Sequence, residues 1–417
     1  MQVDPWLPRA ARTRPLARAL GTLTYAQLDD RVRRAAGALG ARRGERVAIA
    51  LPAGEEFAVA LHACLIAGAI AVPVDLRLPD PPLADATKVI DVPLGDGAPV
   101  EPRPHDLGAT AIIVHTSGTT AAPRPIELTF GNWLWSALGS AAALGVQPHD
   151  AWLCTLPLSH VGGLSILLRS AIYATAAQVH ERWDTERALA AIAGGATLVS
   201  VVPTTLARLL DAGLNQPPAL RCALVGGGPC PPALLERARA AGVPVAQTYG
   251  LTEACSQVTT ARAGDAQADA GPALFCTRVT IDDGEICVRS PTVAPQAGAV
   301  LRTGDLGSLD ADGRLTVTGR RAETIVTGGE NVAPTEVEAV LETHPAVLEA
   351  LVEGRPDARW GEAVAALVVL KPGTPPAEVQ LREFCASRLA AFKVPKAFEF
   401  VAALPRTPSG KLLRRKK

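Results

Sequence analysis

The stretch that decides the fold spans residues 115–124 and reads His115-Thr116-Ser117-Gly118-Thr119-Thr120-Ala121-Ala122-Pro123-Arg124. An apolar run at residues 111–114 comes directly before it and predicts a buried strand. Four hydroxyl side chains and a glycine then follow within five residues. A turn of this composition can direct several backbone N–H groups and hydroxyl donors at one point, as a bound polyphosphate requires. A Ser/Thr-rich surface turn is the alternative that this stretch alone leaves open.

Length and composition limit the classes of protein to consider. A chain of 417 residues predicts two or three domains. Lys plus Arg and Asp plus Glu both number 41, which argues against nucleic acid or an anionic membrane as the main partner. The eight cysteines form no C-x-x-C pair and lie in apolar segments, so we expect reduced thiols in a cytoplasmic protein.

The N-terminus lacks the layout of a signal peptide. The long apolar segment at residues 57–74 contains His62, Gly68 and Pro73. These residues favour a helix followed by a short strand over a membrane-spanning helix. We therefore expect a soluble protein.

Helices and strands are expected to alternate on both sides of the deciding stretch. Thr24 and Gln27 form a capping-box pattern that opens a helix, and Gly40 ends it. A strand at 47–51, a helix at 55–67 and a strand at 69–74 follow, whereas residues 1–20 and 75–108 are expected to be irregular. This alternation predicts a parallel sheet with helices on its faces.

The alternation continues over residues 131–247, and short hairpin patterns replace it at about 272–318. We therefore expect an α/β fold. Its large N-terminal domain, residues 1–318, should contain parallel-rich sheets with flanking helices and a small β-subdomain at about 272–318. Residues 319–323 should form a hinge, and residues 324–417 a small, mobile α+β domain.

Two common nucleotide-binding signatures are missing. Ser409-Gly410-Lys411 resembles the end of a P-loop, but Pro405 replaces its first glycine and Leu412 its final hydroxyl residue. No G-x-G-x-x-G follows a predicted strand. P-loop NTPases and dinucleotide-dependent oxidoreductases are therefore disfavoured.

Five separated segments instead resemble, in order, the motifs of one superfamily. They are Thr116 to Arg124, Tyr249-Gly250-Leu251-Thr252-Glu253, Arg302-Thr303-Gly304-Asp305, Gly319 to Glu338, and Pro405-Arg406-Thr407-Pro408-Ser409-Gly410-Lys411. Together they are similar to the adenylate-forming acyl-CoA synthetases, which include acyl- and aryl-CoA ligases, luciferase and adenylation domains. The resemblance covers roughly residues 20–415. Within it, residues 156–170 and 327–331 are most similar to the ligases that act on o-succinylbenzoate in menaquinone synthesis, although benzoate-type ligases share parts of both segments.

This resemblance implies two half-reactions. A carboxylate attacks the α-phosphate of ATP and releases pyrophosphate, and coenzyme A then attacks the acyl-adenylate and releases AMP. The implied partners are ATP, Mg²⁺, coenzyme A and an aromatic carboxylic acid. Positioning and charge stabilisation are the protein's main contributions to such chemistry.

The resemblance also assigns the nucleotide-binding residues. Contacts to the β- and γ-phosphates would come from Thr116, Ser117, Gly118, Thr119, Thr120 and Arg124. Glu253 would bind Mg²⁺, and Thr252, which is also a catalytic candidate, would contact the α-phosphate. The adenosine would lie against Gly226, Gly227, Gly228, Tyr249, Gly250, Asp305 and Arg320. Lys411 would be the catalytic lysine, neutralising charge in the transition state.

The acid and coenzyme A sites follow from the same resemblance. His160, which is also a catalytic candidate, Ser165, Arg169 and Gly227 would contact the acid, and Gly328, Gly329 and Glu330 the coenzyme. Arg169 follows an apolar helical run, so it either extends to the surface or pairs with a buried carboxylate of the substrate. His160 could equally be an ordinary hydrogen-bonded histidine.

The chain departs from the family pattern at a few positions. Ala121 replaces a glycine of the phosphate loop, Arg124 its lysine, and Pro125 the glycine after that lysine, so we expect a stiffer loop. Ala322 replaces a polar hinge residue, which leaves backbone torsion to provide the hinge. We hypothesise that the C-terminal domain swings between the half-reactions, bringing first Lys411 and then the loop at 328–330 to the site.

Three other functions remain open at this point. They are a ligase for another acid such as benzoate, a catalytically silent nucleotide-binding relative, and an enzyme that loads a carrier protein. The sequence is also compatible with a homo-oligomer.

Overall fold

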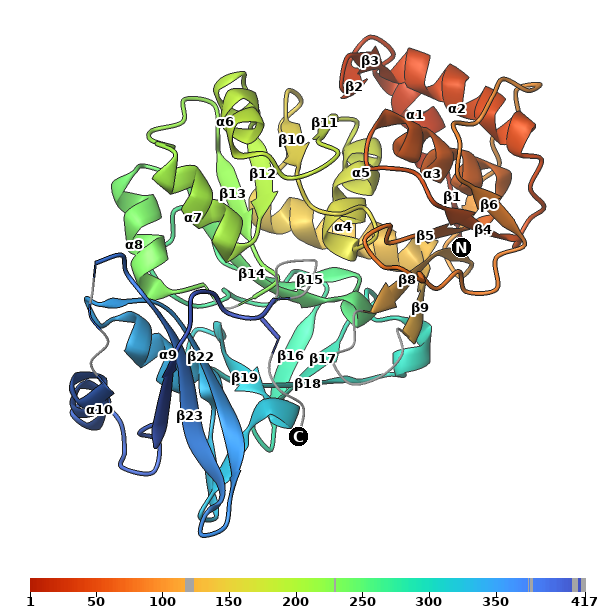
Figure 1. Ribbon diagram of the computed structural model, residues 1–417. Coiled ribbons are helices and arrows are strands. Elements are labelled where there is room, and N and C mark those ends of the chain that lie inside the picture. Colours follow the sequence, from red (N-terminus) through yellow and green to blue (C-terminus); the bar gives the residue numbers. More distant parts are fainter. Residues whose placement is uncertain (117–123, 229, 374, 376–377, 407–411, 414–417) are drawn as a thin grey trace.

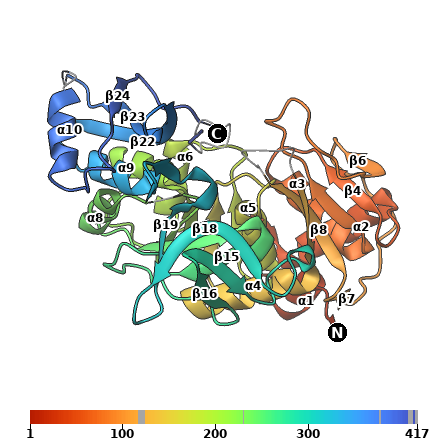
Figure 2. The same cartoon turned by 90° about the horizontal axis from the view of Figure 1, so that it is seen from below.

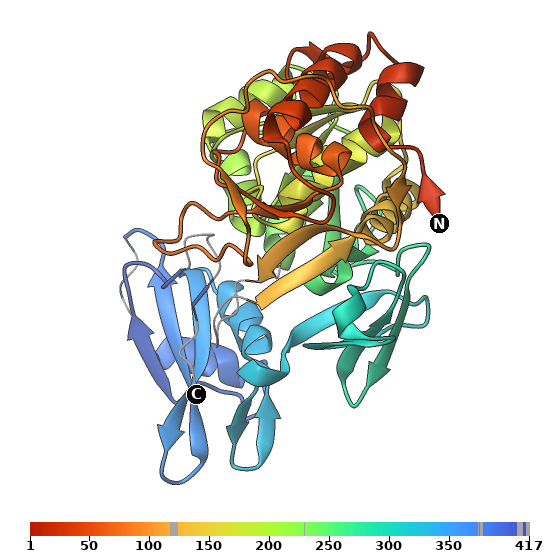
Figure 3. The same ribbon diagram turned by 90° about the vertical axis from the view of Figure 1, so that its right-hand side faces the viewer.

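The computed structural model describes residues 1–116, 124–228, 230–373, 375, 378–406 and 412–413 (Figure 1). Two large sheets, built mainly of parallel strands and flanked by helices, form most of the molecule. A four-stranded antiparallel sheet and a C-terminal α+β unit complete it. Figure 3 shows these two smaller parts below the large sheets, and Figure 2 views them from below. The predicted α/β fold class is confirmed.

The first large sheet has the strand order β6-β4-β5-β8-β9, in which only β9 runs antiparallel to its neighbour. Its strands are β4 (Arg46–Ile49), β5 (Ile70–Pro73), β6 (Lys88–Ile90), β8 (Thr110–Thr116) and β9 (Arg124–Thr129). The helices of this part are α1 (Trp6–Thr13), α2 (Tyr25–Leu39) and α3 (Glu55–Ala67). The expected strand before the deciding stretch is therefore β8, in the interior of a sheet.

The second large sheet has the order β15-β14-β13-β12-β10-β11-β2-β3. Its strands are β2 (Arg18–Leu20), β3 (Leu23–Thr24), β10 (Ala151–Cys154), β11 (Ala176–Val179), β12 (Leu198–Val201), β13 (Cys222–Val225), β14 (Val245–Leu251) and β15 (Ser256–Thr260). Strands β10 to β14 are mutually parallel. The helices are α4 (Phe130–Leu144), α5 (Val161–Tyr173), α6 (Thr185–Ala193), α7 (Pro203–Asp211) and α8 (Pro232–Ala240). The core side chains of α5 pack in one cluster with those of α2 and α3, which joins the two sheets.

The C-terminal unit has a hydrophobic core of its own, whereas the core of the four-stranded sheet also includes Tyr249 of β14 and Val258 of β15. The four-stranded sheet consists of β16 (Arg278–Asp282), β17 (Glu285–Arg289), β18 (Leu301–Leu309) and β19 (Leu315–Arg320). The C-terminal unit contains β20 (Ile325–Thr327), β21 (Glu330–Val332), α9 (Pro334–Glu342), β22 (Val347–Asp357), β23 (Gly361–Leu370), α10 (Glu378–Ala386) and β24 (Ala397–Phe400). Between the two parts, residues 319 and 320 end β19, and the short helix η3 (Arg321–Glu323) follows.

Local chemistry explains why α2 begins and ends where the sequence predicts. The Thr24 hydroxyl accepts a hydrogen bond from Gln27 N, and the Gln27 side chain accepts one from Thr24 N, so the expected capping box is present. Gly40 ends the helix with φ +54°, a left-handed conformation that favours glycine. The buried stripe on α2 faces the core shared with α3.

Three segments differ from the sequence prediction. Residues 6–13, expected to be irregular, form α1, because Trp6, Leu7 and Ala10 supply a buried face despite the surrounding arginines. The expected loop at 75–108 contains β6, which pairs with β4, and β7 (His105–Asp106), which pairs with β1 (Gln2–Val3). Strand β9 begins with Arg124 and Pro125, and its pairing with β8 decides its conformation.

No helix in the described part of the chain is long and apolar enough to cross a bilayer. The apolar segment at 57–74 forms α3 and β5, as expected.

Two buried histidines make the stability of the fold depend on pH. His62 lies inside α3, and His105 stacks on Phe130 with ring centroids 4.2 Å apart. Burial lowers the pKa of each imidazole from 6.5 to about 4. The unfolded chain therefore binds more protons than the native protein between these values, and stability is lost as the pH falls through this window.

We therefore expect the free energy of unfolding to decrease as the pH falls from about 6.5 to about 4, by on the order of 3 kcal/mol for each histidine. Urea titrations at a series of pH values measure this decrease. The variant His105→Phe keeps an aromatic ring beside Phe130 and should lose the part of the pH dependence of unfolding that His105 contributes. The surface variant His149→Gln should keep the full pH dependence. An unchanged slope in His105→Phe would contradict the assignment.

Candidate active site

The predicted site residues of the second sheet gather at one edge because its central strands are parallel. His160 follows β10, Gly226 follows β13, and Tyr249 lies at the end of β14. The carboxyl ends of β10, β12, β13 and β14 lie along the same edge of the sheet. Such an edge is where ligands bind in open α/β sheets.

The first sheet brings its own carboxyl ends to the same place. Thr116 ends β8, and Asp75 follows β5, the parallel neighbour of β8. Arg77 donates to Nε2 of His160 over 3.0 Å, which links the loop after β5 to the residue before α5. The candidate site therefore lies between the carboxyl edges of the two large sheets.

Tyr249, Asp305 and Arg320 form a connected group between β14 and the four-stranded sheet. The Tyr249 hydroxyl donates to Oδ2 of Asp305 over 2.8 Å, and Arg320 Nε lies 3.0 Å from Oδ1. Burial, with the adjacent Asp305 carboxylate, raises the pKa of Tyr249, so its hydroxyl remains a donor. Each carboxylate oxygen can accept more than one hydrogen bond, which leaves capacity on Asp305 for a ligand hydroxyl.

Glu253 is the candidate metal ligand. It lies in the short helix η1 (Thr252–Ala254) directly after β14, where its side chain is half-buried. Its carboxylate makes no hydrogen bond or ion pair to another described residue, whereas its backbone oxygen accepts from Ala294 N. The described residues contain no group of three or more metal-binding side chains. One free carboxylate fits Mg²⁺, which typically takes one or two carboxylates together with substrate phosphates and water.

The glycines of the site serve two different purposes. A Cβ on Gly226 would approach the Thr248 side chain to 2.8 Å, and Gly227 has φ +79°, so this turn tolerates side chains poorly. A Cβ on Gly250 would approach the backbone oxygen of Ser256 to 1.8 Å. Gly250 is thus required for the close contact between β14 and β15. This structural requirement is independent of any contact with a nucleotide.

Arg169 is a buried cation without a carboxylate among the described residues. Its side chain, on α5, is 2% exposed, and its Nη2 donates to the Ser136 hydroxyl over 3.1 Å. Ser136 in turn donates to the backbone oxygen of Cys255 over 2.7 Å, so its lone pair is directed at the guanidinium. The guanidinium also lies over the Trp152 ring, 5.7 Å from the centroid.

Two further features indicate that no described residue neutralises the charge of Arg169. Nε of Arg169 is buried and has no hydrogen-bond partner among the described residues. Burial lowers the pKa of Arg169, although a guanidinium remains protonated at neutral pH. A buried charge of this kind is costly unless an anion pairs with it.

Two other acid-site candidates, His160 and Ser165, lie just before α5 and within it. His160 precedes the first residue of α5 and is half-buried. Burial, with the nearby Arg77, lowers the pKa of His160 and favours the neutral ring. Ser165 is buried, and its hydroxyl donates to the oxygen of Gly162 over 3.0 Å, so it is available to a ligand only as an acceptor.

The candidate coenzyme A loop forms the turn of the β20–β21 hairpin. Thr327 pairs with Glu330, and Gly328 and Gly329 occupy the turn with φ +59° and +86°. Trp360 covers one side of this turn, because a Cβ on Gly328 would lie 2.8 Å from its ring. The turn therefore presents backbone and the exposed Glu330 to the surroundings.

Several predicted residues fall outside the described ranges, namely Ser117, Gly118, Thr119, Thr120 and Lys411. Their flanking residues are described. Thr116 pairs with Arg124 in the β8–β9 hairpin, and Arg406 forms a bridge with Leu412. The side chain of Arg124 is exposed.

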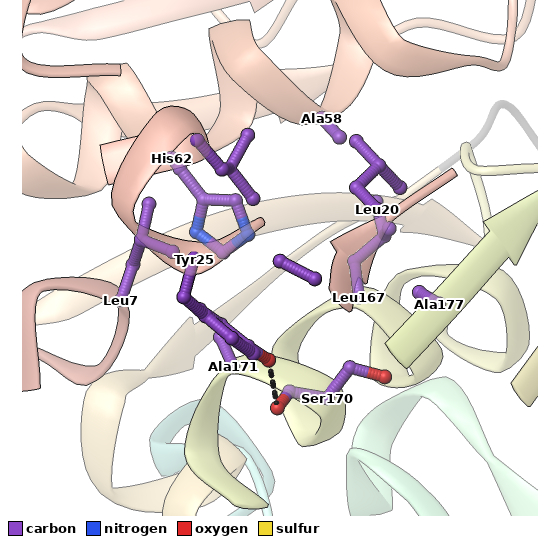
Figure 4. Close-up of a pocket in the computed structure, with 11 residues that line it drawn as sticks. Leu7, Leu20, Tyr25, Ala58, His62, Leu167, Ser170, Ala171 and Ala177 are labelled. Atoms are coloured by element: carbon purple, nitrogen blue, oxygen red, sulfur yellow. Dashed lines mark hydrogen bonds between the residues drawn. The ribbon is translucent and has the colours of Figure 1, made fainter. Parts of the chain in front are cut away.

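A small buried cavity lies elsewhere, between α1, α2, α3 and α5 (Figure 4). Its lining is mostly apolar, with His62 and Ser170 beside Tyr25, whose hydroxyl donates to the backbone oxygen of Ser170 over 2.7 Å. None of the predicted site residues lines it. It lies within the N-terminal core.

Three residues that were not predicted from the sequence support the predicted ones. Arg77 and Asp75 lie in the segment expected to be a surface loop, and Ser136 lies within α4. The Asp75-Leu76-Arg77 sequence directly after the apolar strand at 69–74 could have indicated Asp75 and Arg77. Ligands of open α/β sheets bind at the carboxyl ends of the strands, where these two residues lie. A single serine inside a helix carries no comparable signal.

Two family models match most of this chain. The family model of the AMP-binding enzymes matches residues 7–94 and 83–296, and that of the AMP-binding enzyme C-terminal domain matches residues 336–411. The chain therefore belongs to the AMP-binding enzyme family.

Individual members of this family are similar to the chain over nearly its full length. The 2-succinylbenzoate–CoA ligase of Bacillus licheniformis is 38% identical, and the match covers 99% of this chain and 98% of that protein. The structure of o-succinylbenzoate coenzyme A synthetase from Bacillus subtilis with ATP and magnesium ion has a TM-score of 0.91 at 35% identity, with 99% of each chain covered. A double mutant of that enzyme bound to its product analogue OSB-NCoA has a TM-score of 0.72 at 36% identity, covering 99% of this chain and 98% of the other.

Proposed function

We propose that this protein is an ATP-dependent o-succinylbenzoate–CoA ligase of menaquinone biosynthesis. It forms an acyl-adenylate from o-succinylbenzoate and ATP with release of pyrophosphate, and then transfers the acyl group to coenzyme A with release of AMP. Family membership and the full-length similarity to 2-succinylbenzoate–CoA ligases support this proposal. The observation that carries the choice of acid is the buried, uncompensated guanidinium of Arg169.

Arg169 favours an acid with two carboxylates. One carboxylate must react at the α-phosphate, so a monocarboxylic acid such as benzoate would leave Arg169 unpaired in the complex. o-Succinylbenzoate has a second carboxylate, and a buried arginine–carboxylate pair repays the desolvation of both groups when its hydrogen bonds are made. Ser136 and Trp152 hold the guanidinium from two sides, which leaves its remaining donors for this carboxylate.

The nucleotide would lie across the carboxyl edge of the second sheet. We propose that Asp305, connected to Tyr249 and Arg320, accepts the ribose hydroxyls, and that the turn at Gly226 and Gly227 lies against the adenine and the acyl group. The phosphates would extend from Thr252 toward Thr116 at the end of β8 and Arg124 at the start of β9. Donors fixed before the reaction stabilise the charge that accumulates at the α-phosphate.

Glu253 is the residue that would hold Mg²⁺, since its carboxylate is free of other described side chains. The ion would neutralise part of the triphosphate charge.

We further propose that residues 319–323 are a hinge and that the C-terminal domain, residues 324–417, changes orientation between the two steps. The arrangement of this chain is closer to the ATP-bound structure, with a TM-score of 0.91, than to the one bound to a product analogue, with 0.72. The identities and coverages of the two comparisons are similar, so sequence divergence does not explain the difference. The described orientation would then serve adenylation, and the turn at Gly328 and Gly329 would meet coenzyme A in the other.

We also propose that the enzyme works in the cytoplasm. All eight cysteines are free, and ATP and coenzyme A are available there.

A panel of carboxylic acids tests the proposed function. Pyrophosphate release should require o-succinylbenzoate, and coenzyme A should be consumed in equal amount. Benzoate and other monocarboxylic acids should be used at least about 10²-fold less efficiently, because Arg169 then remains unpaired.

Each of the other outcomes of this panel supports a different function. Efficient use of benzoate would favour a general aryl-CoA ligase, and release of pyrophosphate without consumption of coenzyme A would favour loading of a carrier protein. No ATP–pyrophosphate exchange with any acid would favour a silent relative.

A further inference from the structure

Asp75, Arg77 and His160 form a chain of contacts at the junction of the two large sheets. Nε and Nη2 of Arg77 donate to Oδ1 and Oδ2 of Asp75 over 2.7 Å and 2.5 Å. The same Nη2 lies 3.0 Å from Nε2 of His160. Asp75 thus fixes the plane of the guanidinium, and the guanidinium contacts one defined nitrogen of the imidazole.

The chemistry of the donor determines the protonation of the ring. A guanidinium has only N–H donors and is not deprotonated in proteins, so the nitrogen that it contacts must offer a lone pair. Nε2 of His160 is therefore unprotonated. The ring proton is then on Nδ1, and the imidazole carries no charge.

We propose that Arg77, oriented by Asp75, is a positioning residue that fixes the Nδ1–H tautomer of His160 and keeps this ring neutral during adenylation. A histidinium at this place would pair with the carboxylate of the acid and reduce its nucleophilicity. A neutral ring can donate one hydrogen bond from Nδ1 and leaves the carboxylate its full charge as the attacking group. The effect on the attacking carboxylate rests on the proposed function. The tautomer of His160 follows from its contact with Arg77 and does not depend on that function.

The surroundings of His160 agree with this role. Within the described residues, Asp75 and Arg77 are the charged groups that face the ring, and Asp75 Oδ2 is 3.9 Å from Nε2. Burial and the charge of Arg77 lower the pKa of His160, while Asp75 opposes them. Arg77 is itself held by Asp75, so turning the guanidinium away from His160 would break this ion pair.

Nuclear magnetic resonance of the full chain with ¹⁵N-labelled histidine tests the proposal without substrate. The His160 signals, identified by their loss in His160→Gln, should show an unprotonated Nε2 and a protonated Nδ1 at neutral pH. Arg77→Met should give a mixture of tautomers and a higher pKa for His160. Arg77→Lys, which keeps a donor, should restore much of the original spectrum.

A pH profile of pyrophosphate release provides the functional readout. Arg77→Met should lose rate most strongly on the acidic side, where His160 now becomes protonated, whereas Arg237→Met, from a surface pair with Asp211, should follow the wild type. A protonated Nε2 in the wild type, or an unchanged spectrum in Arg77→Met, would overturn the proposal. If no acid supported pyrophosphate release, the proposed function would fail while the spectra still decided the tautomer.

Discussion

Replacing Arg169 by methionine should remove most of the activity with o-succinylbenzoate while leaving the protein as stable as before or more stable. The native guanidinium is buried without a carboxylate among the described residues, so the folded protein bears its desolvation cost. Methionine is unbranched and flexible, fills irregular space in a core, and has no charge to bury. Replacing buried ionic groups by apolar side chains is often neutral or stabilising.

The loss of activity follows from the second carboxylate of the acid. In Arg169→Met that carboxylate would enter a buried site without a partner, at a cost of about 3–5 kcal/mol. This corresponds to a decrease of about 10²–10⁴-fold in kcat/KM for o-succinylbenzoate. The residual activity with benzoate should decrease much less. Steady-state kinetics with both acids, together with thermal unfolding, measure the two effects.

Arg221 provides a matched control, because it is also an arginine with buried polar contacts. It pairs with the buried Asp150 over 2.6 Å, so Arg221→Met should lower stability by leaving that carboxylate unpaired. The contrast between the two variants separates a binding role from a structural one. If Arg169→Met destabilised the protein as Arg221→Met does, with equal losses for both acids, Arg169 would be a structural residue.

Replacing Lys411 by alanine should separate the two half-reactions. Lys411 lies outside the described residues, and its role rests on the resemblance of its motif and on the family match to residues 336–411. Loss of a positioned charge at the α-phosphate should reduce the rate of adenylation by at least about 10²-fold. Formation of the thioester from supplied acyl-adenylate should continue at nearly the wild-type rate, since the second conformation would place this lysine away from the site.

Single-turnover measurements of pyrophosphate release and of thioester formation give the two rates separately. Lys393→Ala is the control, because this lysine lies in the same domain and pairs with Glu336 at the surface. It should leave both rates unchanged. Equal losses of both half-reactions in Lys411→Ala would contradict a change of domain orientation between the steps.

Features that depend on local sequence could be predicted well. The capping box at Thr24 and Gln27 and the glycine at position 40 define α2 because each acts within a few residues. Alternating strands and helices indicated the parallel sheets for the same reason. No strand was predicted at residues 124–129, and the pairing of β9 with β8 decides the conformation of this segment.

The architecture of the site depends on contacts between distant residues, which explains what the sequence could not show. Residues 77 and 160 meet because two sheets face each other, and residues 136 and 169 meet because α4 packs against α5. The resemblance supplied Arg169 as a candidate but left it between a surface position and a buried one. Its burial and its contact with Ser136 come from the fold alone.

The most direct test of the central claim is to follow the oxygen atoms of the acid. When o-succinylbenzoate with ¹⁸O in its carboxylates reacts with ATP and coenzyme A, attack on the α-phosphate should transfer one labelled oxygen to AMP. The pyrophosphate should contain no label. Label in inorganic phosphate, or AMP without label, would contradict an acyl-adenylate intermediate.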